Sequence, residues 1–94
     1  MKLDKINEIS LVLSQETDPL KIEEFIKSIL TGKEVSDISN RWELVRLLDK
    51  GMTQRKIASD LQLSLCKITR GSRELNKKNS IFKEMLDKYD ELKK

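Results

Sequence analysis

Apolar residues recur every three or four positions along most of the chain, and this spacing predicts helices. Alternating β-branched runs and hairpin turn pairs, which would indicate strands, do not occur. The pattern therefore predicts an all-α fold, a single domain of six helices over residues 1–94. The expected helices are residues 2–15, a second that begins at Pro19 and ends at Thr31-Gly32, 34–50, 54–60, about 65–76, and a last one within 80–94.

Residues that cap helices stand at several predicted boundaries. Asp18 precedes Pro19, which suits the first helical position, and Gly51 can end the third helix. Thr53 and Ser64 precede the fourth and fifth helices, where a hydroxyl oxygen can accept a free backbone N–H. These two hydroxyl residues either only cap their helices or also contact a phosphate, because helix amino termini attract anions.

The fourth and fifth helices, with the turn between them, have the pattern of a helix-turn-helix over residues 53–76. Ala58 is the small residue that lets the two helices approach each other closely. Gln62 stands in the turn, where a positive φ is common, and a left-handed glutamine should cost about 1 kcal/mol. The apolar residues expected to hold the helices together are Ile57, Leu61, Leu63 and Ile68.

Basic residues concentrate on this same stretch. The net charge of the chain is +3, but residues 50–78 alone carry +6 and the rest carries −3. A positive field centred on a helix-turn-helix predicts contact with DNA phosphates, whereas a basic face without function would only be solvated. Arg55 is the expected reader of guanine, while Lys77 and Lys78 are expected to meet phosphates. The expected DNA-facing residues are Gln54, Arg55, Ser64, Leu65, Cys66, Lys67, Thr69, Arg70 and Lys77.

The apolar content is too small for six helices to share an independent core. Hydrophobic residues make up 37% of the chain and charged residues another 37%. A domain of this length buries only roughly 60–65% of its unfolded surface. We therefore expect a homodimer, with residues 1–51 and the helix within 80–94 as dimerisation helices. Trp42, on the apolar stripe of the third helix, is expected to anchor the core or the dimer.

The composition excludes several kinds of site. The chain has no histidine and one cysteine, Cys66. A disulfide within the chain, a Cys/His zinc site and any histidine triad are therefore excluded, no metal is expected, and an enzyme is the weakest interpretation. A free thiol suits a reducing cytoplasm, and no apolar run could span a membrane, so we expect a cytoplasmic protein without a membrane partner.

Two short motifs give the chain a resemblance to a known family. Residues 52–58 read MTQRKIA, and residues 68–72 read ITRGS. Together they resemble the tryptophan repressor family, itself a standard example of helix-turn-helix docking, over about Leu30 to Leu75. The resemblance implies an interlocked homodimer of six-helix subunits, a palindromic operator in double-stranded DNA, and L-tryptophan as the corepressor.

The corepressor pocket of that family maps onto particular residues of this chain. By resemblance, Arg41 and Arg70 would flank the indole, Arg70 would also meet the carboxylate, and Gly71 would leave room for the ligand. Glu74 stands where the family has a serine near the ligand's amino group, so its carboxylate could pair with the ammonium or neutralise Arg70. The implied ligand-binding residues are Leu30 and Thr31 of the partner subunit, with Arg41, Leu44, Val45, Arg70, Gly71 and Glu74.

The sequence therefore predicts a DNA-binding transcriptional repressor that is activated by L-tryptophan and controls tryptophan-related genes. One alternative is a ligand-independent helix-turn-helix module, such as a constitutive repressor or the targeting domain of a transposase, and Glu74 supports it. Another is a helical adaptor whose basic face docks on acidic proteins. A strong preference for one duplex, with steep loss of affinity at high salt, would exclude the adaptor.

Overall fold

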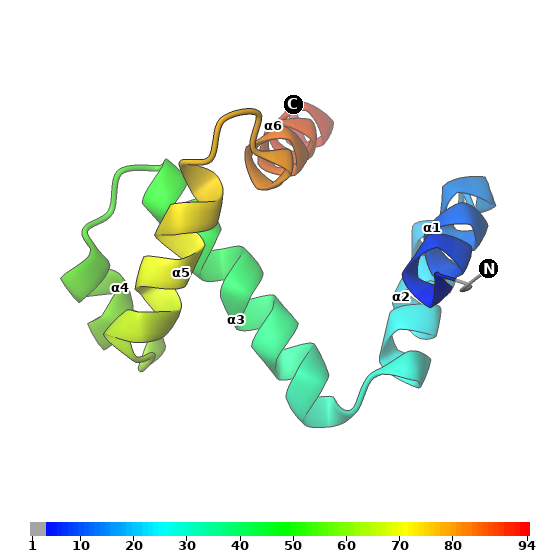
Figure 1. Cartoon of the computed structure of the whole chain (residues 1–94), viewed down its shortest axis with the longest axis horizontal. Helices are drawn as coiled ribbons and strands as arrows, with labels where there is room; N and C mark the ends of the chain where they lie inside the picture. The colour runs from blue at the N-terminus through cyan, green and yellow to red at the C-terminus, as the bar shows by residue number, and fades with distance from the viewer. Residues whose placement is uncertain (1–3) are drawn as a thin grey trace. The chain divides into compact units, whose positions relative to one another are not determined.

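Residues 4–94 are described by a computed structural model, and they form six helices and no strand. This confirms the prediction of an all-α, six-helix fold. The helices, drawn in Figure 1, are α1 (Lys5–Gln15), α2 (Pro19–Ile29), α3 (Gly32–Asp49), α4 (Gln54–Leu61), α5 (Leu65–Leu75) and α6 (Ile81–Lys93). None of the helices in this part of the chain is both long enough and apolar enough to cross a membrane.

The chain divides into two compact units, and the boundary falls inside α3. The first unit ends at Ser36 and contains α1, α2 and the first turn of α3. Asp4 caps α1 by accepting two backbone N–H groups, and Asp18 caps α2 directly before Pro19, as predicted. The predicted start of α1 at residue 2 lies outside the described residues.

The start of α3 differs from the prediction of residue 34. Thr31 and Glu34 form a capping box: the Glu34 N–H donates to Thr31 Oγ1 at 3.1 Å, and the Thr31 N–H donates to Glu34 Oε1 at 2.8 Å. The helix therefore begins at Gly32, and the interpretation of Thr31-Gly32 as the end of the second helix was wrong. α2 ends at Ile29, because Leu30 takes an extended conformation with φ −110° and ψ 150°.

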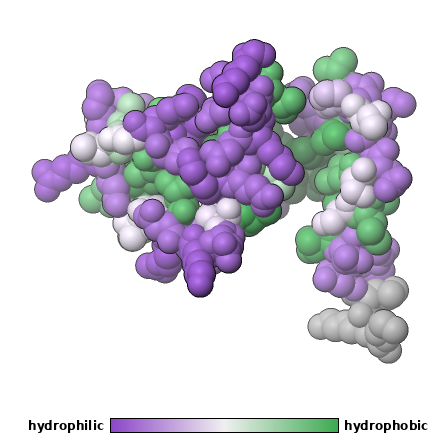
Figure 2. All heavy atoms as spheres, turned by 90° about the horizontal axis from the view of Figure 1, so that it is seen from above, coloured by the Kyte–Doolittle hydropathy of each residue, from purple (hydrophilic) through white to green (hydrophobic). Residues whose placement is uncertain are grey.

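Apolar side chains of α1 and α2 lie at the surface of the first unit. No residue of either helix is buried. Ile6, Leu11, Val12 and Leu20 are between 60% and 70% exposed, and Figure 2 shows hydrophobic side chains on the surface of this unit. The apolar side chains of α1 and α2 are therefore not covered by the rest of the described chain.

The second unit, Asp37–Lys94, holds the buried core. α5 packs against both α4 and α6 (Figure 1). The core brings together one or two residues from each of α3, α4, α5 and α6, all at most 2% exposed: Leu44, Val45, Ile57, Ile68 and Leu86. Burial of these aliphatic side chains is the main term that stabilises the unit.

Trp42 connects α3 to α6 within the second unit. Its ring stacks on Phe82 with centroids 5.8 Å apart and meets the edge of Tyr89 at 6.1 Å. Trp42 therefore packs against the core, which is the first of its two predicted roles. Lys83 of α6 adds an ion pair at 2.9 Å to Asp49, the last residue of α3. These contacts hold α6 against the C-terminal part of α3.

Candidate DNA interface and ligand hollow

The capping residues and the turn give α4 and α5 the geometry of a helix-turn-helix. Thr53 Oγ1 accepts the Lys56 N–H at 3.2 Å, and Ser64 Oγ accepts the Lys67 N–H at 3.4 Å, so both predicted caps are confirmed. Between the helices, Gln62 has φ 54° and ψ 47°, the left-handed conformation expected for this turn. Its N–H donates to the carbonyl oxygen of Ala58, which closes α4.

Buried residues lock α5 to its neighbours. Ile57 of α4 and Ile68 of α5 are both fully buried. At Gly71, α5 approaches α3 closely, because a Cβ there would press into the Leu44 side chain and lie 3.0 Å from Val45 Cγ2. Packing therefore favours a glycine at this position, independently of the room it was predicted to leave for a ligand.

The exposed face of α5 carries the first of two hollows, which we call the outer hollow. It is lined by Leu65, Cys66, Thr69, Arg70, Arg73, Glu74 and Lys77. Within the described residues, Arg70 and Arg73 have no ion pair within 4 Å, so their charges face solvent. The serine cap places the free N–H groups of the first turn of α5 at the same end as Leu65 and Cys66.

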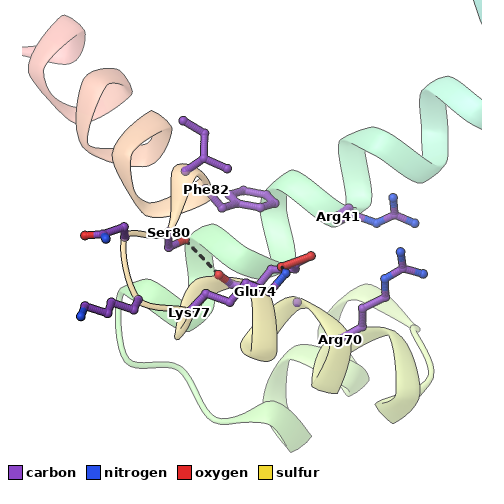
Figure 3. A pocket seen from close by; sticks show the side chains of 10 residues that line it. Arg41, Arg70, Glu74, Lys77, Ser80 and Phe82 are labelled. Carbon is purple, nitrogen blue, oxygen red and sulfur yellow. Dashed lines mark hydrogen bonds and ion pairs between the residues drawn. The ribbon is translucent and has the colours of Figure 1, made fainter. Parts of the chain in front are cut away.

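The second hollow, of about 380 Å³, is called the inner hollow; it lies between α3, α5 and the connection to α6 (Figure 3). Arg41 from α3 and Arg70 from α5 extend on the same side of it. Ser80 orders the connection, because its Oγ donates to the Glu74 carbonyl oxygen at 2.9 Å and accepts the Lys83 N–H at 3.1 Å. The lining residues are Arg41, Arg70, Gly71, Glu74, Lys77, Lys78, Asn79, Ser80, Ile81 and Phe82.

Glu74 carries the negative charge of the inner hollow. Its carboxylate pairs with the ammonium group of Lys77, one turn further along the chain. The hydrogen bond from Lys77 lowers the pKa of Glu74 and outweighs the opposing effect of burial, and the charges of Lys77, Arg70 and Arg73 lower the pKa further. Glu74 is therefore ionised at neutral pH. The inner hollow combines an anion, several cations and the ring of Phe82.

Comparison with known proteins shows the family to which the chain belongs. The family described as "Trp repressor protein" matches residues 4–90. The chain belongs to the Trp repressor family. The Trp repressor family is a family of regulators, and membership supports a repressor.

Two relatives of the Trp repressor family show the extent of the similarity. A Trp operon repressor homolog of Chlamydia trachomatis serovar L2 is 35% identical over 68 residues, which are 71% of this chain and 72% of that protein. A Trp operon repressor homolog of Haemophilus influenzae strain PittEE is 30% identical over 91 residues, 96% of this chain and 90% of that protein. No solved structure matches the chain with statistical significance.

The structure of this Trp repressor family member groups the residues predicted to face DNA into two sets. The outer hollow gathers Leu65, Cys66, Thr69, Arg70 and Lys77, and adds Arg73. Gln54, Arg55, Ser64 and Lys67 are exposed but do not line the outer hollow. Their contact with DNA stays a prediction.

The residues predicted to bind the ligand lie in three places: the inner hollow, the buried core and the first unit. Arg41, Arg70, Gly71 and Glu74 line the inner hollow together, whereas Leu44 and Val45 are buried in the core and do not line it. Leu30 and Thr31 belong to the first unit, and their role in a partner subunit's pocket stays a prediction.

Sequence reasoning did not anticipate the place of Lys77, Ser80 and Phe82 in the inner hollow. Lys77 was assigned to DNA alone, although its spacing of three residues from Glu74 on a helix end signals an ion pair. Phe82 lies in the second position of α6, with no sequence signal that links it to α3 or α5. Only the packing of α6 beside α5 brings it to this hollow.

Proposed function

We propose that this member of the Trp repressor family is a homodimeric, sequence-specific DNA-binding repressor of tryptophan-related genes, whose operator binding is activated by L-tryptophan. The proposed DNA-binding unit is residues 53–76, and the proposed dimerisation helices lie in residues 1–51 and 80–94. The protein would act in the cytoplasm, where it meets double-stranded palindromic operator DNA.

The exposed face of α5 supports DNA binding. It presents Arg70 and Arg73, and the exposed Lys67 is nearby in sequence. The major groove of DNA is wide enough to admit an α-helix such as α5. Phosphate contacts from such cations position a protein on the duplex, and arginine is the commonest reader of guanine. The charge of +6 on residues 50–78 supports the same conclusion.

The inner hollow suits an aromatic amino acid. Arg41 and Arg70 offer two guanidinium planes, which can stack on an indole ring and bind a carboxylate. Phe82 adds an apolar wall, and Glu74 offers an ionised acceptor to an ammonium group. The residues present therefore match the aromatic ring, the carboxylate and the ammonium group of tryptophan.

The exposed apolar residues support a homodimer. In the first unit they include Leu11, Val12 and Leu20, which are at least 60% exposed. On α6 they include Ile81 at 62% and Leu92 at 83%. Monomeric soluble proteins rarely leave such stripes uncovered, and a second copy of the chain would bury them.

The single observation that carries the proposal is that Arg70 lines both hollows. A ligand that contacts Arg70 in the inner hollow can change which orientation of α5 is populated. Such a ligand activates operator binding only as far as it binds the DNA-competent orientation more tightly.

A mobility-shift titration tests the proposal. The duplex is the DNA upstream of the protein's own gene, and the salt concentration is fixed, with and without L-tryptophan. We expect a retarded complex of one dimer per duplex whose affinity rises on adding L-tryptophan, with no rise for the variant R41A. Equal affinity with and without L-tryptophan would refute corepressor control.

A ligand-independent DNA-binding module is the second candidate. It is favoured by one observation: the charge of Glu74 acts on Arg70, which weakens the attraction of Arg70 for a ligand carboxylate. Calorimetric titration of the free protein with L-tryptophan separates the candidates, since this module would release no heat of binding while still retarding the duplex.

A further inference from the structure

Three residues belong to both hollows of the second unit. Arg70, Glu74 and Lys77 line the inner hollow, where the ligand is proposed to bind, and the outer hollow on the exposed face of α5. Glu74 and Lys77 are paired with each other. A change in the partner of Glu74 in one hollow therefore changes the charge available in the other.

Glu74 is the one carboxylate among the residues that line the inner hollow, whereas Arg41, Arg70, Lys77 and Lys78 are all basic. A ligand carboxylate can bind to any of several cations there. A ligand ammonium group finds a single ionised acceptor, and Lys77 holds it.

We propose that Glu74 determines the ligand specificity of the inner hollow by exchanging Lys77 for the ammonium group of an aromatic amino acid. Lys77 is released by this exchange and serves the outer hollow, where it contacts a DNA phosphate. This inference rests on the proposed function, because it requires a zwitterionic aromatic ligand in the inner hollow.

The geometry allows the exchange. The side chain of Lys77 is 59% exposed and that of Glu74 is 42% exposed, so the pair is held weakly and can separate without opening the core. The exchange leaves Glu74 paired with an ammonium group in both states, so the carboxylate always keeps a cationic partner. A ligand without an ammonium group leaves Lys77 on Glu74 and gains no such partner.

Calorimetric titration of the full-length protein tests the specificity. The ligands are L-tryptophan and indole propionate, which differ by the ammonium group alone. A hydrogen bond to a charged group contributes about 1.5–3 kcal/mol, and displacement of Lys77 reduces this gain by about two- to fivefold. The wild type should therefore prefer L-tryptophan by about threefold or more. The variant E74Q keeps the shape of the side chain and should lose most of this preference.

Two lysine variants test the exchange. K77Q removes the cation that must leave Glu74, so its affinity for L-tryptophan should rise by about two- to fivefold, the range expected for an exposed ion pair. K78Q is the matched control, because Lys78 lines the inner hollow, does not line the outer one, and has no ion pair within 4 Å among the described residues. Its affinity for L-tryptophan should not rise.

The release of Lys77 has its own readout in the salt dependence of DNA binding. Each phosphate contact adds about 0.9 to the slope of log affinity against log salt concentration. With L-tryptophan, the slope for the wild type should exceed that for K77Q by about 0.9 per subunit. Without ligand, the two slopes should agree.

The outcomes separate this inference from the function on which it rests. Equal affinity of the wild type for both compounds, or an unchanged preference in E74Q, overturns the role of Glu74 and leaves the corepressor function standing. A difference in slope between the wild type and K77Q that L-tryptophan does not change overturns the release of Lys77. Binding of neither compound overturns the proposed function and this inference with it.

Discussion

The close approach of α5 to α3 at Gly71 gives a sharp test of how the helix-turn-helix is held. The substitution G71A adds one methyl group, directed at Leu44 and Val45. Leu44 is 2% exposed and Val45 is fully buried, so both side chains would have to shift within the core to admit the methyl group.

Two effects of G71A oppose each other. Alanine stabilises the interior of a helix by about 1 kcal/mol relative to glycine. Insertion of a methyl group into a packed core costs about 1–3 kcal/mol, because side chains must leave their preferred rotamers or the backbone must shift. G32A provides the reference, since a Cβ at Gly32 meets nothing within 4 Å. We expect G71A to be less stable than G32A by about 1–3 kcal/mol.

Thermal unfolding followed by circular dichroism, at one fixed chain concentration, measures this difference. For a domain of this size, 1 kcal/mol changes Tm by about 4–8 °C, so G71A should melt at least about 4 °C below G32A. The double variant G71A/L44A should lose less stability than the two single losses added together, since the missing Leu44 side chain makes room for the methyl group. If G71A melts as high as G32A, close packing at Gly71 does not hold α5 in place.

Further expectations concern the turn, the caps and the ion pairs. Q62G should raise Tm, because it removes a left-handed strain of about 1 kcal/mol at φ 54°; N79G should gain less, since asparagine tolerates φ 57°, and equal gains would contradict this. S64A should cost about 1 kcal/mol through loss of the cap of α5, and an unchanged Tm would refute that role. The hydrogen bond from Lys83 to Asp49 raises the pKa of Lys83 above 10.5, so its stabilisation is complete below that pH and is lost as the pH rises through the folded-state pKa. The difference in Tm between the wild type and K83M should therefore shrink above pH 10.5, and a constant difference would contradict this reasoning.

Local signals predicted most helix boundaries. Pro19, Thr53 and Ser64 mark helix starts where the structure has them, since capping joins groups two or three residues apart. The left-handed Gln62 was predictable because it stands in the turn of the helix-turn-helix pattern, where a positive φ is common. The start of α3 was missed although its signal, the capping box of Thr31 and Glu34, was present in the sequence. The pair Thr31-Gly32 can also end a helix, and this interpretation was preferred to the capping box.

By itself, the sequence determined the helices, the helix-turn-helix pattern and the basic charge of residues 50–78, because these depend on residue type and short-range spacing. Only the tertiary structure decided that Phe82 and Ser80 join Arg41 and Glu74 in one hollow, and that Glu74 holds Lys77 there. It also decided that Gly71 serves the packing of α5 on α3. These placements follow from how α3, α5 and α6 bury their apolar faces against one another, a contact between segments distant in sequence that no local pattern specifies.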